Sequence, residues 1–336
     1  MKVLLYYQDY EKIGTSGIGR AQKHQSEALR RVGVDFTYDP KDNYDIAHIN
    51  TLWNKSERVL KEARKRGVPV IVHGHSTHED WRDSFCFWRV LEPYVDHQID
   101  KMYGAADLVI TPTEYSKRCI DSYGLGTKVI AISNGIDVKD YEADPTMEKR
   151  FKEKFHLKDG EKFVMGVGFP FIRKGIDTFF EVARNFPDIK FIWFGHLPWI
   201  AQSMKIHHVL SKKPANVILP GYIEGALIHA SYRLASAMLF PSREETEGIV
   251  TLEALASGTP LLIRDIPVYD PWLIDGVNCH KAKDTSDFVK KLSYLLEKGD
   301  DPSILRAGFE VAQARNLSDI GERLKEAYSS LLTKKQ

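Results

Sequence analysis

Two glutamates in the second half of the chain, Glu245 and Glu253, are separated by seven residues. Between them, Gly248, Ile249 and Val250 are expected to begin a helix, so that their backbone N–H groups point outward. A carboxylate accepts hydrogen bonds from two hydroxyls, which is what the diol of a sugar ring or a ribose offers. The segment therefore predicts a nucleotide-sugar site, in which backbone amides bind phosphate and two flanking carboxylates bind diols.

Two adjacent cations, Arg173 and Lys174, lie between a predicted strand and a predicted helix, just before Gly175. A guanidinium offers a fork of donors and an ammonium a point charge, and both suit a diphosphate beside a helix N-terminus. A solvated charge pair on a turn is the alternative interpretation.

A glycine-containing loop follows the first predicted strand, with Gly14, Gly17 and Gly19 before a helical pattern. Glycine lets backbone amides approach a phosphate closely. The spacing is not G-x-G-x-x-G, so a dinucleotide fingerprint is not supported, and a plain turn between strand and helix stays open.

Three histidines, His73, His75 and His78, lie at or just beyond the end of the strand predicted at 69–75 and precede the acidic pair at 79–80. We expect no metal, because the segment lacks the spacing of zinc ligands. His75 is expected to hydrogen-bond a polar ligand, whereas His73 also fits a satisfied residue of the core.

Short apolar runs rich in strand formers alternate with amphipathic helical patterns along the chain, which predicts parallel sheets covered by helices on both faces. The pattern restarts after a polar stretch near residue 150. The expected strands lie at 2–7, 44–50, 69–75, 107–113, 128–134, 162–168, 190–195, 217–221, 237–242 and 260–265. The fold class is therefore α/β, with Rossmann-like doubly wound domains at 1–150 and 151–336.

Ligands of such sheets bind beyond the carboxyl ends of the strands. Two facing domains would grip one ligand in the cleft between them. In an alternative version of this division, the C-terminal helix crosses back to the N-terminal domain.

The composition limits the class of partner. The 336 residues carry a net charge of +1, so attraction of the whole chain to nucleic acid is not expected. Cys86, Cys119 and Cys279 have no metal-ligand spacing and are expected to be reduced thiols, as in a cytoplasmic protein. No run of 18 apolar residues is present, so the chain is expected to be soluble or to lie on a membrane.

Several motifs together resemble the retaining GT-B glycosyltransferases of family four. They are PSREE, which precedes Glu245, LEALASG, which contains Glu253, SNGID at 133–137 and RKG at 173–175. The segments SGIGRAQKHQ, HGHSTHED, FIRKGID, REETEGIVTLEALAS and RDIPVY are similar to galactosyl-glucosyl-diacylglycerol synthases of Gram-positive bacteria. The resemblance implies the GT-B fold, a UDP-hexose donor (UDP-galactose or UDP-glucose), a glucosyl-diacylglycerol acceptor of the type that anchors lipoteichoic acid, and no cofactor.

The resemblance also assigns roles to residues. Glu253 is expected to hold the ribose and Glu245 the donor hexose, with His75 beside that hexose. Arg173 and Lys174 are expected to bind the diphosphate over the loop that contains Gly17 and Gly19. Two departures are Phe169, where many relatives carry arginine, and Thr246-Glu247, where many carry Gly-Phe.

A lipid acceptor requires contact with a membrane. Residues 55–66 predict a helix with Lys55, Arg58, Lys61 and Lys65 on one face, which suits an anionic surface. In a long helix predicted from residue 80, Trp81, Phe85 and Trp88 follow the spacing i, i+4, i+7 and suit the membrane interface. A solvated basic face and an aromatic core stripe are the alternatives. The expected location is peripheral, on the inner face of the cell membrane.

The sequence also fits three alternative functions. The same type of enzyme could act on a polysaccharide precursor or a small molecule, and dependence of activity on lipid would separate these acceptors. A non-catalytic subunit that binds nucleotide sugars is disfavoured, because both glutamates are present, and a GT-B-like epimerase would leave the aromatic and basic helices without a purpose. Neither the donor hexose nor the oligomeric state follows from the sequence.

Overall fold

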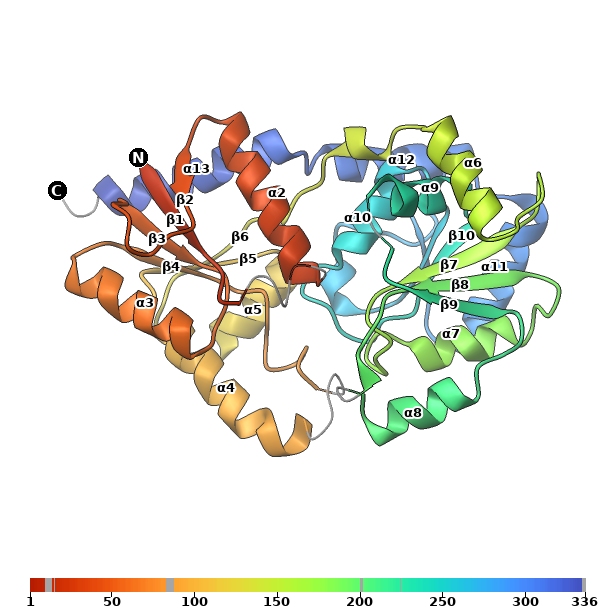
Figure 1. The fold of residues 1–336 in the computed structure, drawn as a ribbon, viewed down its shortest axis with the longest axis horizontal. Coiled ribbons are helices and arrows are strands. Elements are labelled where there is room, and N and C mark those ends of the chain that lie inside the picture. The colour runs from red at the N-terminus through yellow and green to blue at the C-terminus, as the bar shows by residue number, and fades with distance from the viewer. Residues whose placement is uncertain (10–13, 15, 83–87, 200–201, 224, 334–336) are drawn as a thin grey trace. The chain divides into compact units, whose positions relative to one another are not determined.

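The computed structural model describes residues 1–9, 14, 16–82, 88–199, 202–223 and 225–333. The chain forms two compact units (Figure 1). The N-terminal unit contains Met1–Trp81, Arg89–Ile136 and Arg315–Gln336, and the C-terminal unit contains Arg82–Trp88 and Asp137–Ala314. The units therefore meet in sequence at Ile136 and Asp137, rather than near residue 150.

The N-terminal unit is built on a six-stranded sheet in the order β2-β1-β3-β4-β5-β6, in which every pair is parallel. Its central strands are buried along their whole length, as expected for a sheet covered on both faces. The strands are β1 (Lys2–Tyr6), β2 (Asp35–Thr37), β3 (Ile46–Ile49), β4 (Val70–His73), β5 (Leu108–Thr111) and β6 (Val129–Ala131). The helices are α2 (Gly17–Arg31), α3 (Asn54–Lys65), α4 (Trp88–Gly104), α5 (Glu114–Ser122) and α13 (Leu317–Thr333).

The C-terminal unit repeats this plan with a parallel sheet in the order β12-β11-β10-β7-β8-β9. Its strands are β7 (Phe163–Val167), β8 (Lys190–Phe194), β9 (Val217–Gly221), β10 (Ala237–Phe240), β11 (Leu261–Arg264) and β12 (His280–Ala282). Its α-helices are α6 (Pro145–Lys154), α7 (Ile176–Ala183), α8 (Met204–Ser211), α9 (Ala226–Leu234), α10 (Ile249–Ala256), α11 (Thr285–Lys298) and α12 (Pro302–Gln313). Short 3-10 helices are η1 (Val138–Tyr141) and η3 (Pro267–Tyr269).

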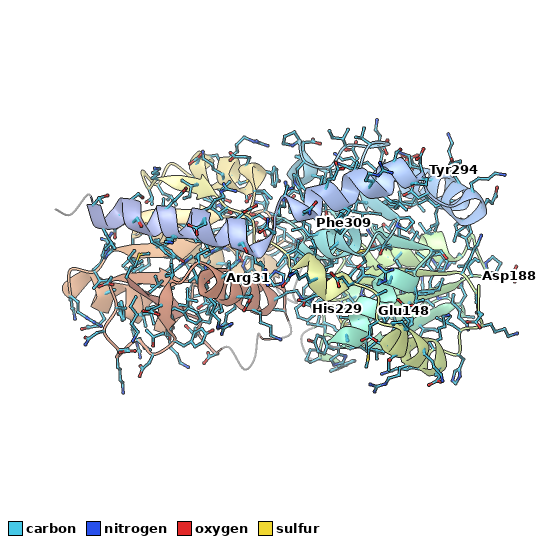
Figure 2. The ribbon with its side chains drawn as sticks, turned by 90° about the horizontal axis from the view of Figure 1, so that it is seen from above. Arg31, Glu148, Asp188, His229, Tyr294 and Phe309 are labelled. Atoms are coloured by element: carbon cyan, nitrogen blue, oxygen red, sulfur yellow. The ribbon has the colours of Figure 1, made fainter. Side chains whose placement is uncertain are left out.

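The last helix, α13, belongs to the N-terminal unit although the whole C-terminal unit precedes it in sequence. It packs along α2, whose last residue, Arg31, is labelled in Figure 2. Gly321 makes this approach possible, because a Cβ atom there would lie 2.3 Å from the carbonyl oxygen of Ala28. The C-terminal segment is thereby part of the first core, with Leu324 and Tyr328 buried in it.

Two features differ from the sequence predictions. The edge strands β2 and β12 were not predicted, because each has three residues and lacks an apolar run. The helix predicted from residue 80 begins instead at Trp88, and Trp81 lies in a turn. Trp81 is partly buried against the N-terminal core and meets the ring of Trp53 edge-on at 5.8 Å. Phe85, predicted on the same face, lies outside the described residues, as does Cys86.

Candidate functional site

The strand order of the C-terminal sheet creates a switch point between β7 and β10. From β7 the chain continues to β8 on one side, whereas β10 lies on the other side and continues to β11. Loops that leave the carboxyl ends of two such strands diverge and leave a crevice for a ligand. The loop after β7 carries Arg173 and Lys174, and the loop after β10 carries Glu245.

Gly175 holds these two loops together. Its φ of +77° lies in the left-handed region, and a Cβ atom on it would lie 2.3 Å from the carbonyl oxygen of Pro241. Any side chain would therefore separate the loops. A hydrogen bond of 2.7 Å from the backbone N–H of Arg243 to the carbonyl oxygen of Arg173 joins the loops further.

This contact brings Lys174 and Glu245 into a buried ion pair. Lys174 Nζ lies 2.5 Å from Oε1 and 2.7 Å from Oε2 of Glu245, and Ser242 Oγ donates to Oε1 at 2.6 Å. Burial alone would raise the pKa of the Glu245 carboxyl. The charges of Lys174 and Arg173, with these hydrogen bonds, outweigh burial and lower that pKa. Glu245 is therefore an anion whose two oxygens are already engaged. Arg173 Nη1 donates to the carbonyl oxygen of Glu244 at 2.7 Å.

Glu253, the second glutamate of the motif, lies in α10 and is 1% exposed. Its Oε2 accepts a 2.6 Å hydrogen bond from the hydroxyl of Tyr232, on α9. Gly248 precedes α10 with a φ of +80° and, as a glycine, supplies no side chain to cap the first turn. The N-terminus of this helix therefore offers backbone donors between the two glutamates in sequence, as the motif predicts.

The glycine loop of the N-terminal unit has a more structural character than its sequence suggests. A Cβ atom on Gly19 would lie 2.4 Å from the carbonyl oxygen of Gly14, so glycine is needed for packing of the loop on α2. The N–H of Gly19 donates to Ser16 Oγ at 3.3 Å. Gly17 is exposed at the start of α2 with open space around its Cα, which leaves room for a ligand near the first turn.

His75 and His73 lie together at the carboxyl end of β4, and their rings stack at 4.0 Å. The ring of His48, on β3, lies nearly parallel to that of His73, with the ring centroids 5.2 Å apart. Burial lowers the pKa of His48 and of His75 to about 3, and that of His73 well below its usual value, so all three rings are neutral at physiological pH. His75 Nε2 lies 3.1 Å from Asn50 Oδ1.

Sequence reasoning missed the partners of these histidines, which are Gln25, His48, Asn50 and Tyr328. The available signal was their place at the end of the strand predicted at 44–50, because His48 and Asn50 lie at the carboxyl end of β3, beside the switch point between β1 and β3. His78 does not join this group. It stacks on Tyr123 at 3.8 Å, and its Nε2 lies 3.0 Å from Asp100 Oδ1. Within the described part of the chain, no group of three His, Cys, Asp or Glu side chains is placed to hold a metal ion.

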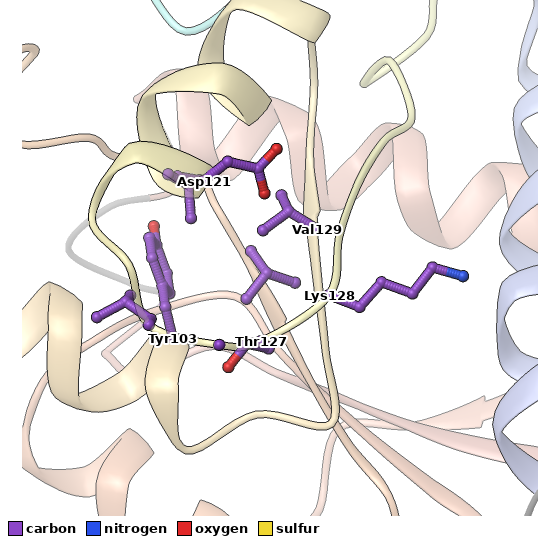
Figure 3. Close-up of a pocket in the computed structure, with 9 residues that line it drawn as sticks. Tyr103, Asp121, Thr127, Lys128 and Val129 are labelled. Atoms are coloured by element: carbon purple, nitrogen blue, oxygen red, sulfur yellow. The ribbon is translucent and has the colours of Figure 1, made fainter.

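A hollow of about 360 Å³ lies elsewhere in the N-terminal unit (Figure 3). It is lined by the end of α4, by α5 and by the start of β6, including Tyr103, Asp121 and Lys128. Thr127 and Lys128 precede β6, so the hollow reaches the amino end of that strand rather than the carboxyl ends that carry the histidines. It is therefore not part of the candidate site.

The predicted basic face of α3 is exposed, but it also carries acids. Lys55 pairs with Asp9 at 2.5 Å, Lys61 with Glu57 at 2.5 Å, and Lys65 with Glu62 at 3.8 Å. Arg58, the fourth cation, is exposed. Val59, Leu60 and Ala63 are buried on the opposite face, as the periodicity predicts.

A second exposed surface, which the sequence analysis missed, is the first turns of α4. Val90, Leu91 and Tyr94 are 76%, 44% and 51% exposed. They follow Trp88, which is half-buried. Large apolar side chains that gather at one exposed place are typical of a surface that contacts another apolar phase.

Comparison with known proteins identifies the family. Residues 147–308 match the family model of the glycosyl transferases group 1, and residues 18–140 match that of Glycosyltransferase Family 4. The chain is 45% identical over 333 residues to the processive diacylglycerol alpha-glucosyltransferase of Acholeplasma laidlawii, covering 99% of each protein. The chain is a family-four glycosyltransferase. As such, the enzyme is a hexosyltransferase.

The enzyme is also 28% identical to the alpha-galactosylglucosyldiacylglycerol synthase of Streptococcus pneumoniae, over 92% of this chain and 82% of that protein. Its fold is that of sucrose-phosphate synthase from Thermosynechococcus elongatus, with a TM-score of 0.82, 16% identity and coverage of 99% and 100% of the two chains. HepE of Anabaena, solved in complex with UDP-glucose, gives a TM-score of 0.76 at 16% identity over 98% of this chain and 100% of that chain. These likenesses establish the GT-B fold. Of the helices described for this enzyme, none is both long and apolar enough to span a bilayer.

Proposed function

We propose that the enzyme transfers glucose from UDP-glucose to diacylglycerol or glucosyl-diacylglycerol, with retention of the anomeric configuration. The observation that carries this proposal is the 45% identity, over nearly the whole chain, to an enzyme named as a processive diacylglycerol alpha-glucosyltransferase. That likeness favours glucose as the donor sugar. The synthase of Streptococcus pneumoniae, which is less similar, has a name that points to galactose instead.

In this proposal the C-terminal unit binds the donor. Glu253 accepts hydrogen bonds from the ribose diol, and the amides of Gly248, Ile249 and Val250 face the diphosphate. Lys174 and Arg173 stabilise the charge that grows on the leaving diphosphate as the glycosidic bond breaks. Glu245 orients Lys174 and contacts the donor hexose. His75 of the N-terminal unit is a further contact of the hexose, and the loop of Gly17 and Gly19 is a further contact of the diphosphate.

The reaction in this proposal needs no metal ion, because charge on the leaving group is met by the two cations and the helix amides. The acceptor hydroxyl attacks the face that the diphosphate leaves, and the diphosphate takes its proton. No side chain then has to form a bond to the sugar.

The acceptor requires the enzyme to bind at the inner face of the cell membrane. Support for a peripheral contact comes from the N-terminal unit, where Val90, Leu91 and Tyr94 expose apolar surface on α4. Full burial of an exposed apolar side chain contributes roughly 1.5–3 kcal/mol, and these side chains, of which Leu91 is 44% and Val90 is 76% exposed, would each contribute a fraction of that. The cations of α3 add attraction to anionic lipid, but less than about 1 kcal/mol each because Lys55, Lys61 and Lys65 have acidic partners.

The test is an incubation of the purified enzyme with vesicles that contain diacylglycerol or glucosyl-diacylglycerol, each with UDP-glucose and with UDP-galactose. We expect α-linked glucosyl lipids from UDP-glucose. Transfer only to water-soluble acceptors, with no lipid product, would contradict the proposal, and a galactosyl product would correct its donor. Glu253→Ala is the control for transfer by this site.

A further inference from the structure

A buried network of polar side chains surrounds the histidines of the N-terminal unit. It joins elements far apart in the sequence, since His48 Nδ1 lies 2.7 Å from the hydroxyl of Tyr328, 280 residues away. A buried polar group without a hydrogen-bond partner is costly. Each donor in such a network must therefore face an acceptor, and this requirement determines the direction of its hydrogen bonds. Its members are Tyr7, Gln25 on α2, His48, Asn50, His73, His75 and Tyr328 on α13.

The orientation of Gln25 sets one branch of the network. Its Oε1 accepts from the hydroxyl of Tyr7 at 2.6 Å and from Asn50 Nδ2 at 3.1 Å. Because Asn50 donates through Nδ2, its Oδ1 is an acceptor, and Oδ1 faces His75 Nε2 at 3.1 Å. His75 therefore carries its proton on Nε2. In a neutral imidazole this leaves Nδ1 as an acceptor.

Tyr328 sets the other branch. Its hydroxyl has no further partner among the described residues, so its proton is satisfied only by donation to His48 Nδ1. Gln25 Nε2, a donor, is also closer to Nδ1 of His48 (3.1 Å) than to Nε2 (3.3 Å). His48 therefore carries its proton on Nε2 and donates it to His73 Nδ1 at 3.1 Å. His73 is left with its proton on Nε2, an atom that is buried and has no partner in the described part of the chain.

We propose that Gln25 and Tyr328 are positioning residues of the candidate site, which hold His73 as a donor through Nε2 and His75 as an acceptor through Nδ1. A sugar hydroxyl both accepts and donates a hydrogen bond, whereas a phosphate oxygen only accepts. The pair therefore suits a hydroxyl of the bound sugar. This last step rests on the proposed function, because it takes the ligand to be a sugar. The tautomers themselves follow from the network alone.

The experiment reads the tautomers directly. Long-range ¹H–¹⁵N correlation spectra of the full chain, labelled with ¹⁵N-histidine, distinguish a proton on Nδ1 from one on Nε2. The chain has 12 histidines, and His48→Gln, His73→Gln and His75→Gln variants assign the three signals. We expect all three to be neutral with the proton on Nε2. A proton on Nδ1 of His48 or of His73 would overturn the inference.

Two variants test the positioning role. Tyr328→Phe removes the donor to His48 Nδ1, and we expect His48 and His73 to become mixtures of tautomers while His75, held by Asn50, stays unchanged. Gln25→Met releases Asn50, so the tautomer of His75 should also become mixed. The matched control is Tyr103→Phe, another fully buried tyrosine of the same unit, whose hydroxyl donates to the carbonyl oxygen of Ser76 at 2.6 Å. It should leave all three tautomers as they are.

Activity provides the second readout. By analogy with the residues that orient functional histidines in metal sites, Tyr328→Phe should lower kcat by about tenfold. Tyr103→Phe should leave kcat unchanged for a similar loss of thermal stability. Unchanged His48 and His73 tautomers in Tyr328→Phe would overturn the inference. The wild-type spectrum decides the tautomers even where a variant does not fold. It needs no substrate, so a failure of lipid glycosylation would contradict the proposed function without touching this result.

Discussion

Replacing Lys174 by methionine removes the partner of a buried carboxylate. The side chain of Glu245 is 6% exposed and that of Lys174 is 19% exposed. Removal of one partner of a buried ion pair typically costs 3–5 kcal/mol, because the remaining charge stays uncompensated. Ser242 and Arg173 still act on Glu245 in the variant. We therefore expect a loss near the lower end, about 3 kcal/mol of unfolding free energy at pH 7.

The loss should depend on pH in a defined direction. In the wild type the pKa of Glu245 is lowered from 4.5, so the pair's contribution is present above that pH and is lost as the pH falls through the folded-state pKa. Without Lys174 burial dominates, and the pKa of Glu245 rises above its unfolded value. The cost of the buried charge is then largest at neutral pH and decreases as Glu245 takes up a proton. The difference from wild type should shrink between pH 7 and pH 5.

Urea denaturation at both pH values measures this difference. The fluorescence of Trp193, which is fully buried in the C-terminal unit, contributes to the signal of that unit. The control is Lys117→Met, which breaks an exposed i, i+4 pair with Asp121 in the other unit. It should cost about 0.3–0.5 kcal/mol with little pH dependence. A loss for Lys174→Met no larger than that of the control at pH 7 would refute the reasoning.

A double variant separates stability from catalysis. Lys174→Met with Glu245→Gln leaves no buried charge, so most of the lost stability should return. Turnover should not return, because the ammonium that meets the leaving diphosphate is still missing. A double variant with wild-type kcat/KM for UDP-glucose would remove Lys174 from the proposed mechanism.

Four further predictions concern the donor, the metal, the histidines and the membrane. Glu253→Ala should weaken UDP binding by about 10- to 150-fold, since a hydrogen bond to a charged group contributes roughly 1.5–3 kcal/mol; calorimetry measures the dissociation constant, and an unchanged value in a folded variant would contradict the ribose contact. Activity should survive EDTA, and inhibition that a divalent cation restores would show that a metal is needed. The pKa of His48 and of His75 falls from 6.5 to about 3 on folding, so the unfolded chain binds more protons below pH 6.5, and thermal unfolding should show stability decreasing from pH 6.5 toward 3. Val90→Glu with Leu91→Glu should reduce sedimentation with phosphatidylglycerol vesicles at both low and high salt, whereas Lys61→Glu with Lys65→Glu should reduce it only at low salt. The control is Tyr294→Ser, at an exposed position of the C-terminal unit. If both double variants sediment like the wild type, neither α3 nor α4 is the docking surface.

Local sequence patterns predicted what local geometry determines. The sequence analysis placed Glu245 in a loop and Glu253 inside a helix. It did so because an apolar strand, a polar turn and a helical pattern follow one another between residues 237 and 253, as β10 and α10 confirm. The apolar runs predicted the long central strands. The edge strands β2 and β12 were not predicted, because each is short and lacks the apolar run that marks a buried strand.

Contacts between distant segments were not predictable in this way. The spacing of Trp81, Phe85 and Trp88 favoured one continuous helix, but Trp81 packs in a turn against the N-terminal core. Lys174 and Glu245 were each singled out, yet their pairing depends on the approach of Gly175 to Pro241, 66 positions later. The network of Gln25, His48 and Tyr328 spans most of the chain, so no spacing rule relates its members.

The state of Glu245 bears on how the proposed retention of configuration would be achieved. A carboxylate that attacks the sugar must offer a free lone pair and reasonable basicity. Here Lys174 Nζ lies within 2.7 Å of both oxygens of Glu245, Ser242 Oγ donates to Oε1, and the pKa is lowered. Each of these weakens the carboxylate as a nucleophile while fixing the ammonium in place. In the proposed function, this arrangement favours attack by the acceptor hydroxyl on the face that the diphosphate leaves, with Glu245 holding Lys174 toward the charge that develops there.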